Sequence, residues 1–206
     1  MIIEAISFAS LILIIAMLRR IVTTFPKIVV CVARWKENIN LEENIKLSRD
    51  RDFIAAALAI PFCLTVYENG LVSFRFMSGM SQEAALGVTA ATFVLYYLFR
   101  QFTISVFIPR RKKRGATKAA CNCERTYFTI LAAILLLTQC LSDITGMTPS
   151  DTNRTMLWIS AAAYLLFLIR KYQIFESSHP IFTSFLYLCA LEIIPTGTLI
   201  VSAIIF

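Results

Sequence analysis

The chain has 206 residues, of which 58% are hydrophobic and only 16% are charged, and its mean hydropathy is +0.71. Soluble domains carry about a quarter of charged residues, and a soluble surface this apolar would expose large adhesive patches, so the composition argues against a soluble globular protein. The net charge of +7 falls in the segments between apolar runs, which argues against a nucleic-acid-binding surface and is typical of the loops of a membrane protein.

Apolar runs long enough to cross a bilayer core of about 30 Å recur six times along the chain. They predict transmembrane helices at about 2–18, 53–71, 84–107, 127–144, 155–169 and 181–206. The connections between them are short, and no segment has the composition of a soluble domain. The sequence therefore predicts an all-α fold, a polytopic bundle of about six transmembrane helices forming a single membrane domain over residues 1–206.

Segment 21–35, directly after the first run, has a different pattern. Its apolar residues recur at three- and four-residue spacings, and Lys27 and Arg34 lie on the opposite side. This pattern predicts an amphipathic helix. Such a helix either lies in the inner-leaflet interface with its basic side toward anionic headgroups or packs on the bundle, and the sequence leaves both placements open.

Basic residues alternate between loops. Lys and Arg are frequent in loops 19–52, 108–125 and 170–180, whereas loops 68–83 and 145–154 carry one each. Because basic loops stay in the cytoplasm, we expect these three loops inside and both termini in the periplasm. The expected topology anchors, in loops that also face anionic lipid headgroups, are Arg19, Arg20, Arg110, Arg111, Lys112, Lys113, Arg114, Arg170 and Lys171.

Signatures of enzyme chemistry are missing from the sequence. It contains no G-x-S-x-G, no H-E-x-x-H and no glycine-rich phosphate loop, and its single histidine is His179. Cys121 and Cys123 form a C-x-C pair on an expected loop, without the second ligand pair that zinc requires. We therefore expect a protein that is not an enzyme and holds no cofactor or metal.

Glu192 is the residue that the sequence singles out. It lies about eleven residues into the last predicted helix, roughly 16 Å deep in the bilayer, so its carboxylate should face the bundle interior. Pro195 predicts a kink beside it. Arg100 and Tyr187 are candidate polar partners. A Glu192–Arg100 pair would gate or relay a substrate or proton, and the alternative is a structural hydrogen bond from a protonated Glu192.

The closing segment Phe182-Thr-Ser-Phe-Leu-Tyr-Leu-Cys-Ala-Leu-Glu-Ile-Ile-Pro195 resembles the last helix of the domain-of-unknown-function 4271 family. The stretches Arg19-Arg-Ile-Val-Thr-Thr-Phe-Pro-Lys and Ser48-Arg-Asp-Arg-Asp are also similar to that family, so the resemblance covers nearly the whole chain. It implies a multi-pass protein of the inner membrane of Bacteroidota. No catalytic residue transfers, because the family has no assigned activity.

The sequence is compatible with three functions. We expect first a non-enzymatic accessory or scaffold protein, acting with partner membrane proteins or as a homo-oligomer. The second is a small transporter or proton-coupled permease that uses Glu192. The third is an intramembrane enzyme that modifies lipid, which would need more polar residues near one membrane face than the sequence contains.

Overall fold

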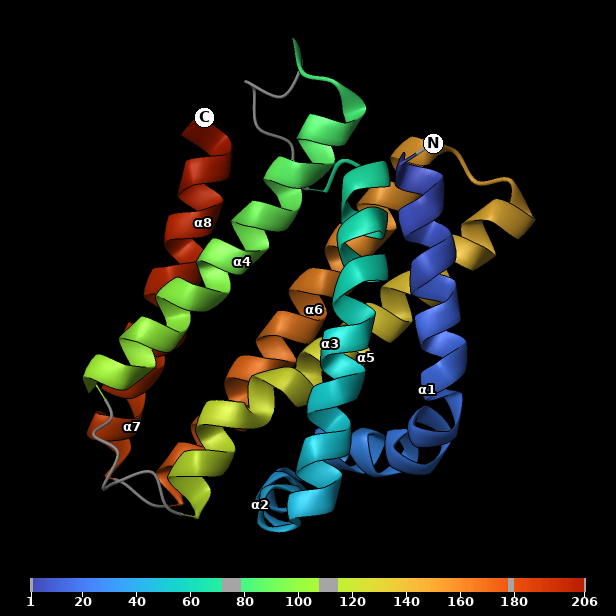
Figure 1. Ribbon diagram of the computed structural model, residues 1–206. Helices are drawn as coiled ribbons and strands as arrows, with labels where there is room; N and C mark the ends of the chain where they lie inside the picture. Colours follow the sequence, from blue (N-terminus) through green and yellow to red (C-terminus); the bar gives the residue numbers. More distant parts are fainter. Residues whose placement is uncertain (1, 72–78, 108–114, 178–179, 206) are drawn as a thin grey trace.

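The computed structural model describes residues 2–71, 79–107, 115–177 and 180–205, and the regular elements in these ranges are helices (Figure 1). This confirms the all-α prediction. The elements in chain order are α1 (Ile2–Ala33), α2 (Trp35–Glu43), α3 (Ile45–Glu68), α4 (Gln82–Phe107), α5 (Ala116–Thr145), α6 (Pro149–Glu176), α7 (Ile181–Leu188), a π-helical turn (Cys189–Ile193) and α8 (Ile194–Ile205).

Four of the described helical segments are long and apolar enough to cross a membrane. By length and composition these are Ile3–Ala33, Ala116–Thr145, Pro149–Glu176 and Ile181–Thr198. Large apolar side chains also cover the outside of the bundle; Phe8, for example, is 65% exposed and Leu137 is 68% exposed. A surface of this kind suits lipid better than water, so the chain has the helix lengths and the surface of a membrane protein.

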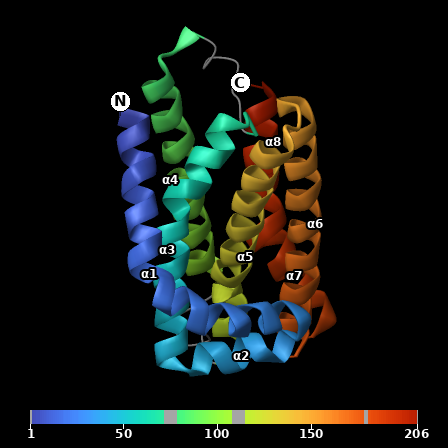
Figure 2. The same ribbon diagram turned by 90° about the vertical axis from the view of Figure 1, so that its right-hand side faces the viewer.

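The first predicted helix does not end at residue 18. α1 continues to Ala33 as one helix that bends, and its second half crosses the base of the bundle beside α2 (Figure 2). Pro26 cannot donate a hydrogen bond to the carbonyl one turn earlier, and the Thr23 hydroxyl donates to the Arg19 carbonyl at 3.0 Å. Both features loosen the helical hydrogen-bond ladder, which accounts for the bend.

The amphipathic segment 21–35 forms this second half of α1, and it packs on the bundle. Ile28 is fully buried and Cys31 is 2% exposed, both in an apolar cluster with residues of α2, α3 and α5. Arg170 of α6 donates from Nη2 to the last carbonyl of α1 at 3.0 Å. Of the two placements that the sequence left open, the structure has the packed one.

The centre of the bundle is α5, which packs against α3 on one side and α6 on the other, while α1 packs against α3. Helix α4 lies beside α8, and both chain ends lie at the end of the bundle opposite α2 (Figure 1). One apolar core cluster joins α3, α5 and α6. Its fully or almost fully buried members include Ile54, Leu135 and Met156.

Three other helices are longer than predicted. α3 begins at residue 45 instead of 53, α5 at 116 instead of 127, and α6 spans 149–176 instead of 155–169. The added turns carry charged residues, which is why a search for apolar runs stops short of them. Several of these charges are paired in the folded chain, among them Arg51, Asp52, Glu124, Arg125 and Lys171.

Candidate functional site

The last helix widens into a π-helical turn at Cys189–Ile193, and Glu192 lies in it. The Ile194 N–H donates to the Cys189 carbonyl, one residue further back than in an α-helix. Pro195 follows directly and has no N–H to donate to the preceding turn. The helix is thus disturbed beside Glu192, and the disturbance takes the form of a π turn, a feature found frequently at functional sites.

Four charged side chains from four helical segments meet at this turn. Arg100 of α4 donates from Nε to Oε2 of Glu192 at 3.3 Å and also binds Oε1 through Nη2. Lys171 of α6 donates from Nζ to the same Oε1, and Nη1 of Arg100 forms an ion pair with Glu124 of α5. We call Arg100, Glu124, Lys171 and Glu192 the buried quartet.

Three of the four quartet residues are almost fully buried. Glu192 is 1% exposed, Arg100 is 3% exposed and Lys171 is fully buried. Two cations face two carboxylates, so the formal charges balance. A lone charge at this depth would be costly, and the pairing offsets much of that cost. The geometry is that of a carboxylate between two cations, and differs from a hydrogen bond of Glu192 to a lone tyrosine or backbone group.

Aromatic side chains surround the quartet. The Tyr164 hydroxyl donates to the backbone carbonyl of Glu192 at 3.4 Å, next to the π turn. Nζ of Lys171 lies 5.4 Å from the ring centroid of Phe167 and 5.8 Å from that of Phe175. Ring faces at these distances attract a cation, so the ammonium is held by electrostatics on the sides that Glu192 does not occupy.

The structure brings together some of the residues predicted from the sequence. Glu192 and Arg100 are in direct contact, and Pro195 is buried just beyond them. Tyr187 lies beside Phe175, with the two ring centroids 5.8 Å apart. Glu192, Arg100 and Pro195 therefore form one site, and Tyr187 borders it through its contact with α6.

The placement of Lys171 corrects a prediction. The sequence put Arg170 and Lys171 in a loop as topology anchors, but α6 continues to Glu176 and the Lys171 side chain is fully buried. One signal was available in the sequence. Phe167, Lys171 and Phe175 recur at four-residue spacing, which places the lysine in the middle of an apolar helix stripe. A basic residue in such a stripe indicates a buried partner.

The other expected anchors divide into two groups. Arg19 and Arg20 are exposed within α1, and Arg20 lies 3.5 Å from a carboxylate oxygen of Asp50 and over the ring of Phe53. The basic tract 110–114 lies outside the described residues. The role of these residues as topology anchors stays a prediction.

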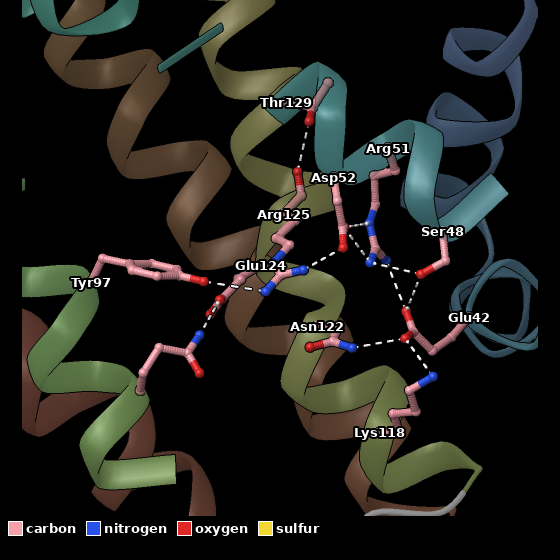
Figure 3. A network of polar contacts seen from close by, with 11 residues as sticks. Glu42, Ser48, Arg51, Asp52, Tyr97, Lys118, Asn122, Glu124, Arg125 and Thr129 are labelled. Atoms are coloured by element: carbon pink, nitrogen blue, oxygen red, sulfur yellow. Dashed lines mark hydrogen bonds and ion pairs between the residues drawn. The ribbon is translucent and has the colours of Figure 1, made fainter. Parts of the chain in front are cut away.

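A second polar network lies at the base of the bundle (Figure 3). Glu42 of α2 accepts hydrogen bonds from Arg51 at 3.0 Å and Asn122 at 2.7 Å, and Lys118 lies 3.1 Å away. Arg51 also pairs with Asp52 at 2.7 Å, and Arg125 pairs with the other oxygen of Asp52. We call Glu42, Arg51, Asp52, Lys118, Asn122 and Arg125 the basal network.

Glu42 is the buried acid of the basal network, since its side chain is 4% exposed and that of Arg51 is 2% exposed. Burial by itself raises the pKa of a carboxyl group. The charge of Arg51, with hydrogen bonds from Asn122 and Lys118, outweighs burial and holds the pKa of Glu42 below its ordinary value. No local sequence pattern indicates these contacts, because the partners of Glu42 come from two other helices, α3 and α5.

A cavity of about 950 Å³ lies between α3, α4, α5 and α6. Its walls are almost entirely apolar, with small residues such as Ala59 on α3 and Gly87 on α4. At one end the lining changes to charged and hydroxyl groups contributed by both polar networks. These groups include Asp52, Tyr96, Tyr97, Arg100, Glu124, Arg125 and Glu192, and the lining also contains Glu83, Tyr127 and Tyr164.

Within the ranges that the structure describes, no group of three or more His, Cys, Asp or Glu side chains could hold a metal ion. The cysteines of the described residues form no disulfide, and Cys121 and Cys123 are buried inside α5 instead of lying on a loop as predicted. Comparison with known proteins adds no relative. No family model, no curated protein and no solved structure matches this chain.

Proposed function

We propose that this chain is a non-enzymatic integral membrane protein that acts as an accessory or scaffold subunit with partner membrane proteins. The observation that supports the proposal is the buried quartet. It ties α4, α5, α6 and the last helix together, and each of its charges already has a partner within the chain. A carboxylate engaged in this way suits a clamp that holds helices in a fixed arrangement. A bacterial inner membrane as its location is part of the proposal; it rests on the sequence resemblance to the domain-of-unknown-function 4271 family alone, since no family model matches the chain.

The proposal includes six membrane spans: the first half of α1, then α3, α4, α5, α6 and the last helix. Four of these belong to segments with the length and composition of a span. α3 and α4 also carry charges, but Arg51 and Arg100 are buried in ion pairs and do not face lipid. The two chain ends lie at the same end of the bundle, as an even number of spans requires (Figure 1). The basic loops then place α2 in the cytoplasm and both termini in the periplasm.

A proton-coupled permease is the second candidate, and one observation favours it. Glu192 and Arg100 line the cavity of about 950 Å³, so an intramembrane acid lies beside open space. An acid that relays protons also needs a carboxylate oxygen that is free to contact the proton or the transported substrate. Both carboxylate oxygens of Glu192 are engaged by Arg100 and Lys171, which is why we prefer the clamp.

Variants that first disturb and then restore the charge balance of the quartet distinguish the two candidate functions. Glu192→Gln leaves one positive charge in excess, and a scaffold should lose about 3–5 kcal/mol of stability together with its co-purifying partners. Adding Lys171→Gln makes the quartet neutral again and should recover most of both. The measurements are the thermal midpoint in mild detergent and the proteins that co-purify after gentle solubilisation. Glu176→Gln, at an exposed position near the end of α6, is the matched control.

A relay predicts a different result for the double variant. Its stability would recover in the same way, but a proton flux measured in vesicles would stay lost, because neither glutamine can carry a proton. A double variant that keeps its fold and its partners while flux across the membrane disappears would contradict the scaffold proposal.

A further inference from the structure

The cavity beside α4 has the size of a ligand pocket. Its volume of about 950 Å³ is at the upper end of the usual range, about 300–1,000 Å³. Small residues line it on α3 and α4, among them Ala59, Gly87 and Ala90. A Cβ added at Gly87 would meet no heavy atom within 4 Å, so the space beside α4 is open. Because the walls are almost entirely apolar, the cavity suits a molecule that is mostly hydrocarbon.

The charged side chains of the lining gather at one end of the cavity. The lining contains four carboxylates and two arginines, namely Asp52, Glu83, Glu124, Glu192, Arg100 and Arg125. Glu83 stands apart from the others. It is exposed in the first turn of α4, roughly 25 Å from Arg100 by helical rise. The other five belong to the buried quartet and the basal network.

The chain itself neutralises the charges at this polar end. The quartet contains two cations and two carboxylates, and beside it Arg51 and Arg125 face Glu42 and Asp52. Lys118, the remaining cation of the basal network, is 52% exposed and does not line the cavity. A charged ligand would therefore bring a charge for which the site holds no counter-charge, and burying it would be costly. The charge balance favours an uncharged ligand.

Two groups at the polar end can each form one more hydrogen bond. Arg125 donates from Nη2 to the Tyr97 hydroxyl at 3.2 Å and from Nη1 to Oδ2 of Asp52 (Figure 3). Among the described residues, the Tyr97 hydroxyl accepts this bond and donates to no acceptor. Oδ1 of Asp52 accepts twice from Arg51, whereas Oδ2 accepts once, from Arg125. A carboxylate oxygen can accept two hydrogen bonds, so Oδ2 can take another.

This donor and this acceptor lie side by side, because the two nitrogens that bind them belong to one guanidinium. Both residues line the cavity and are accessible, since Tyr97 is 43% exposed and the side chain of Asp52 is 35% exposed. A hydroxyl group accepts and donates, so it can bind Tyr97 and Asp52 together. A carbonyl oxygen could not donate to Asp52, and a phosphate would place a second negative charge beside it.

We infer that this cavity binds an uncharged lipid whose head is a hydroxyl group, with diacylglycerol as the occupant. Diacylglycerol combines such a hydroxyl with the acyl chains of ordinary bilayer lipids. Its hydroxyl lies at Tyr97 and Asp52, and an acyl chain runs along Ala59, Gly87 and Ala90.

The depth of the polar end agrees with an uncharged head. Tyr97 lies ten residues before the end of α4, roughly 15 Å by helical rise, whereas charged phosphate headgroups lie at the membrane interface. The inference rests on the membrane spans proposed above and does not depend on the scaffold role. A chain that binds no diacylglycerol could still keep its partners, so the two proposals fail separately.

The test is native mass spectrometry of the full chain in mild detergent, titrated with three lipids that have the same two acyl chains. Diacylglycerol carries the hydroxyl, its acetate ester lacks it, and phosphatidic acid carries a phosphate in its place. We expect diacylglycerol to bind about tenfold more tightly than either, as one hydrogen bond to a charged group would give. Equally tight binding of the acetate ester or of phosphatidic acid overturns the inference.

Two pairs of variants test the position of the lipid. Tyr97→Phe removes the donor and keeps the ring, so diacylglycerol should bind about tenfold more weakly, while Tyr172→Phe, outside the cavity lining, should bind it unchanged. Gly87→Leu fills the space of the acyl chain and should reduce the bound lipid at least about tenfold. Gly197→Leu is its control, because the added Cβ also meets no atom within 4 Å and the residue does not line the cavity. Unchanged diacylglycerol binding by Tyr97→Phe or by Gly87→Leu contradicts the proposed site.

Discussion

Glu42 and Glu192 are both almost fully buried, and both are held by one arginine and one lysine from separate helices. For Glu192 the cations are Arg100 and Lys171, and for Glu42 they are Arg51 and Lys118. The two sites differ in setting, since Glu192 lies inside a candidate membrane span and Glu42 lies in short α2 at the base. The same arrangement, a buried carboxylate between an arginine and a lysine, thus occurs at two places in the fold.

Stability should fall at acid pH through Glu42. Its pKa is lowered in the folded chain, so its contribution to stability is fully present above the ordinary pKa of 4.5 and is lost as the pH falls through the lower folded value. Glu42→Gln should be less stable at neutral pH and should lose less of its thermal midpoint below about pH 4.5. The exposed neighbour Glu43 provides the control, and Glu43→Gln should keep the acid response of the unchanged chain. Identical acid responses for all three proteins would rule out this role of Glu42.

The helices show why sequence patterns predicted the elements better than their ends. Every apolar run became a helix over its described residues, and α5 ends at residue 145, one residue beyond the predicted end. Helix ends were predicted at charged residues, which is correct only when those charges face water. Arg51 and Lys171 continue their helices because their partners arrive from other parts of the chain, and a local pattern carries no trace of a distant partner. The depth of Glu192 was predictable from residue spacing, whereas its contact with Lys171 was not.

The second half of α1 gives a prediction at this scale. Ile28 is fully buried in the cluster that joins α1 to α2, so Ile28→Ala should leave a cavity and cost about 2–5 kcal/mol of stability. Val29 is 46% exposed, and Val29→Ala should change stability by less than about 0.5 kcal/mol. Thermal midpoints in detergent and in lipid nanodiscs would measure both. A similar small effect of the two substitutions would show that this segment does not pack on the bundle.

At the scale of the whole molecule, charge is distributed along the axis of the bundle. The basal network lies at the α2 end with one positive charge in excess, and the opposite end holds both chain ends (Figures 1 and 2). The alternation of basic loops predicted that the two chain ends share a side. The fold of α2 back onto the bundle, which buries Glu42, was not predictable, because residues 37–52 are polar and show no apolar stripe.

Cysteine labelling would test this orientation. Ser150, near the start of α6, and Lys36, in α2, are both exposed and lie toward opposite ends of the bundle. In intact cells, a membrane-impermeant maleimide should label Ser150→Cys and should not label Lys36→Cys. Because native Cys140 is exposed, both variants need Cys140→Ser in the background. Labelling of the Lys36 variant alone would invert the proposed topology.

The π turn gives the last helix two different neighbours. A π turn inserts one extra residue, and each residue of an α-helix turns about 100°, so the contact face before the turn is out of phase with the face after it. α7 packs against α6, and α8 packs against α4. Glu192 lies where the contact changes, with Lys171 of α6 on one side and Arg100 of α4 on the other. The last helix therefore connects two halves of the bundle through its two contact faces. Deleting one uncharged residue of the π turn would rotate α8 away from α4 without altering any charge.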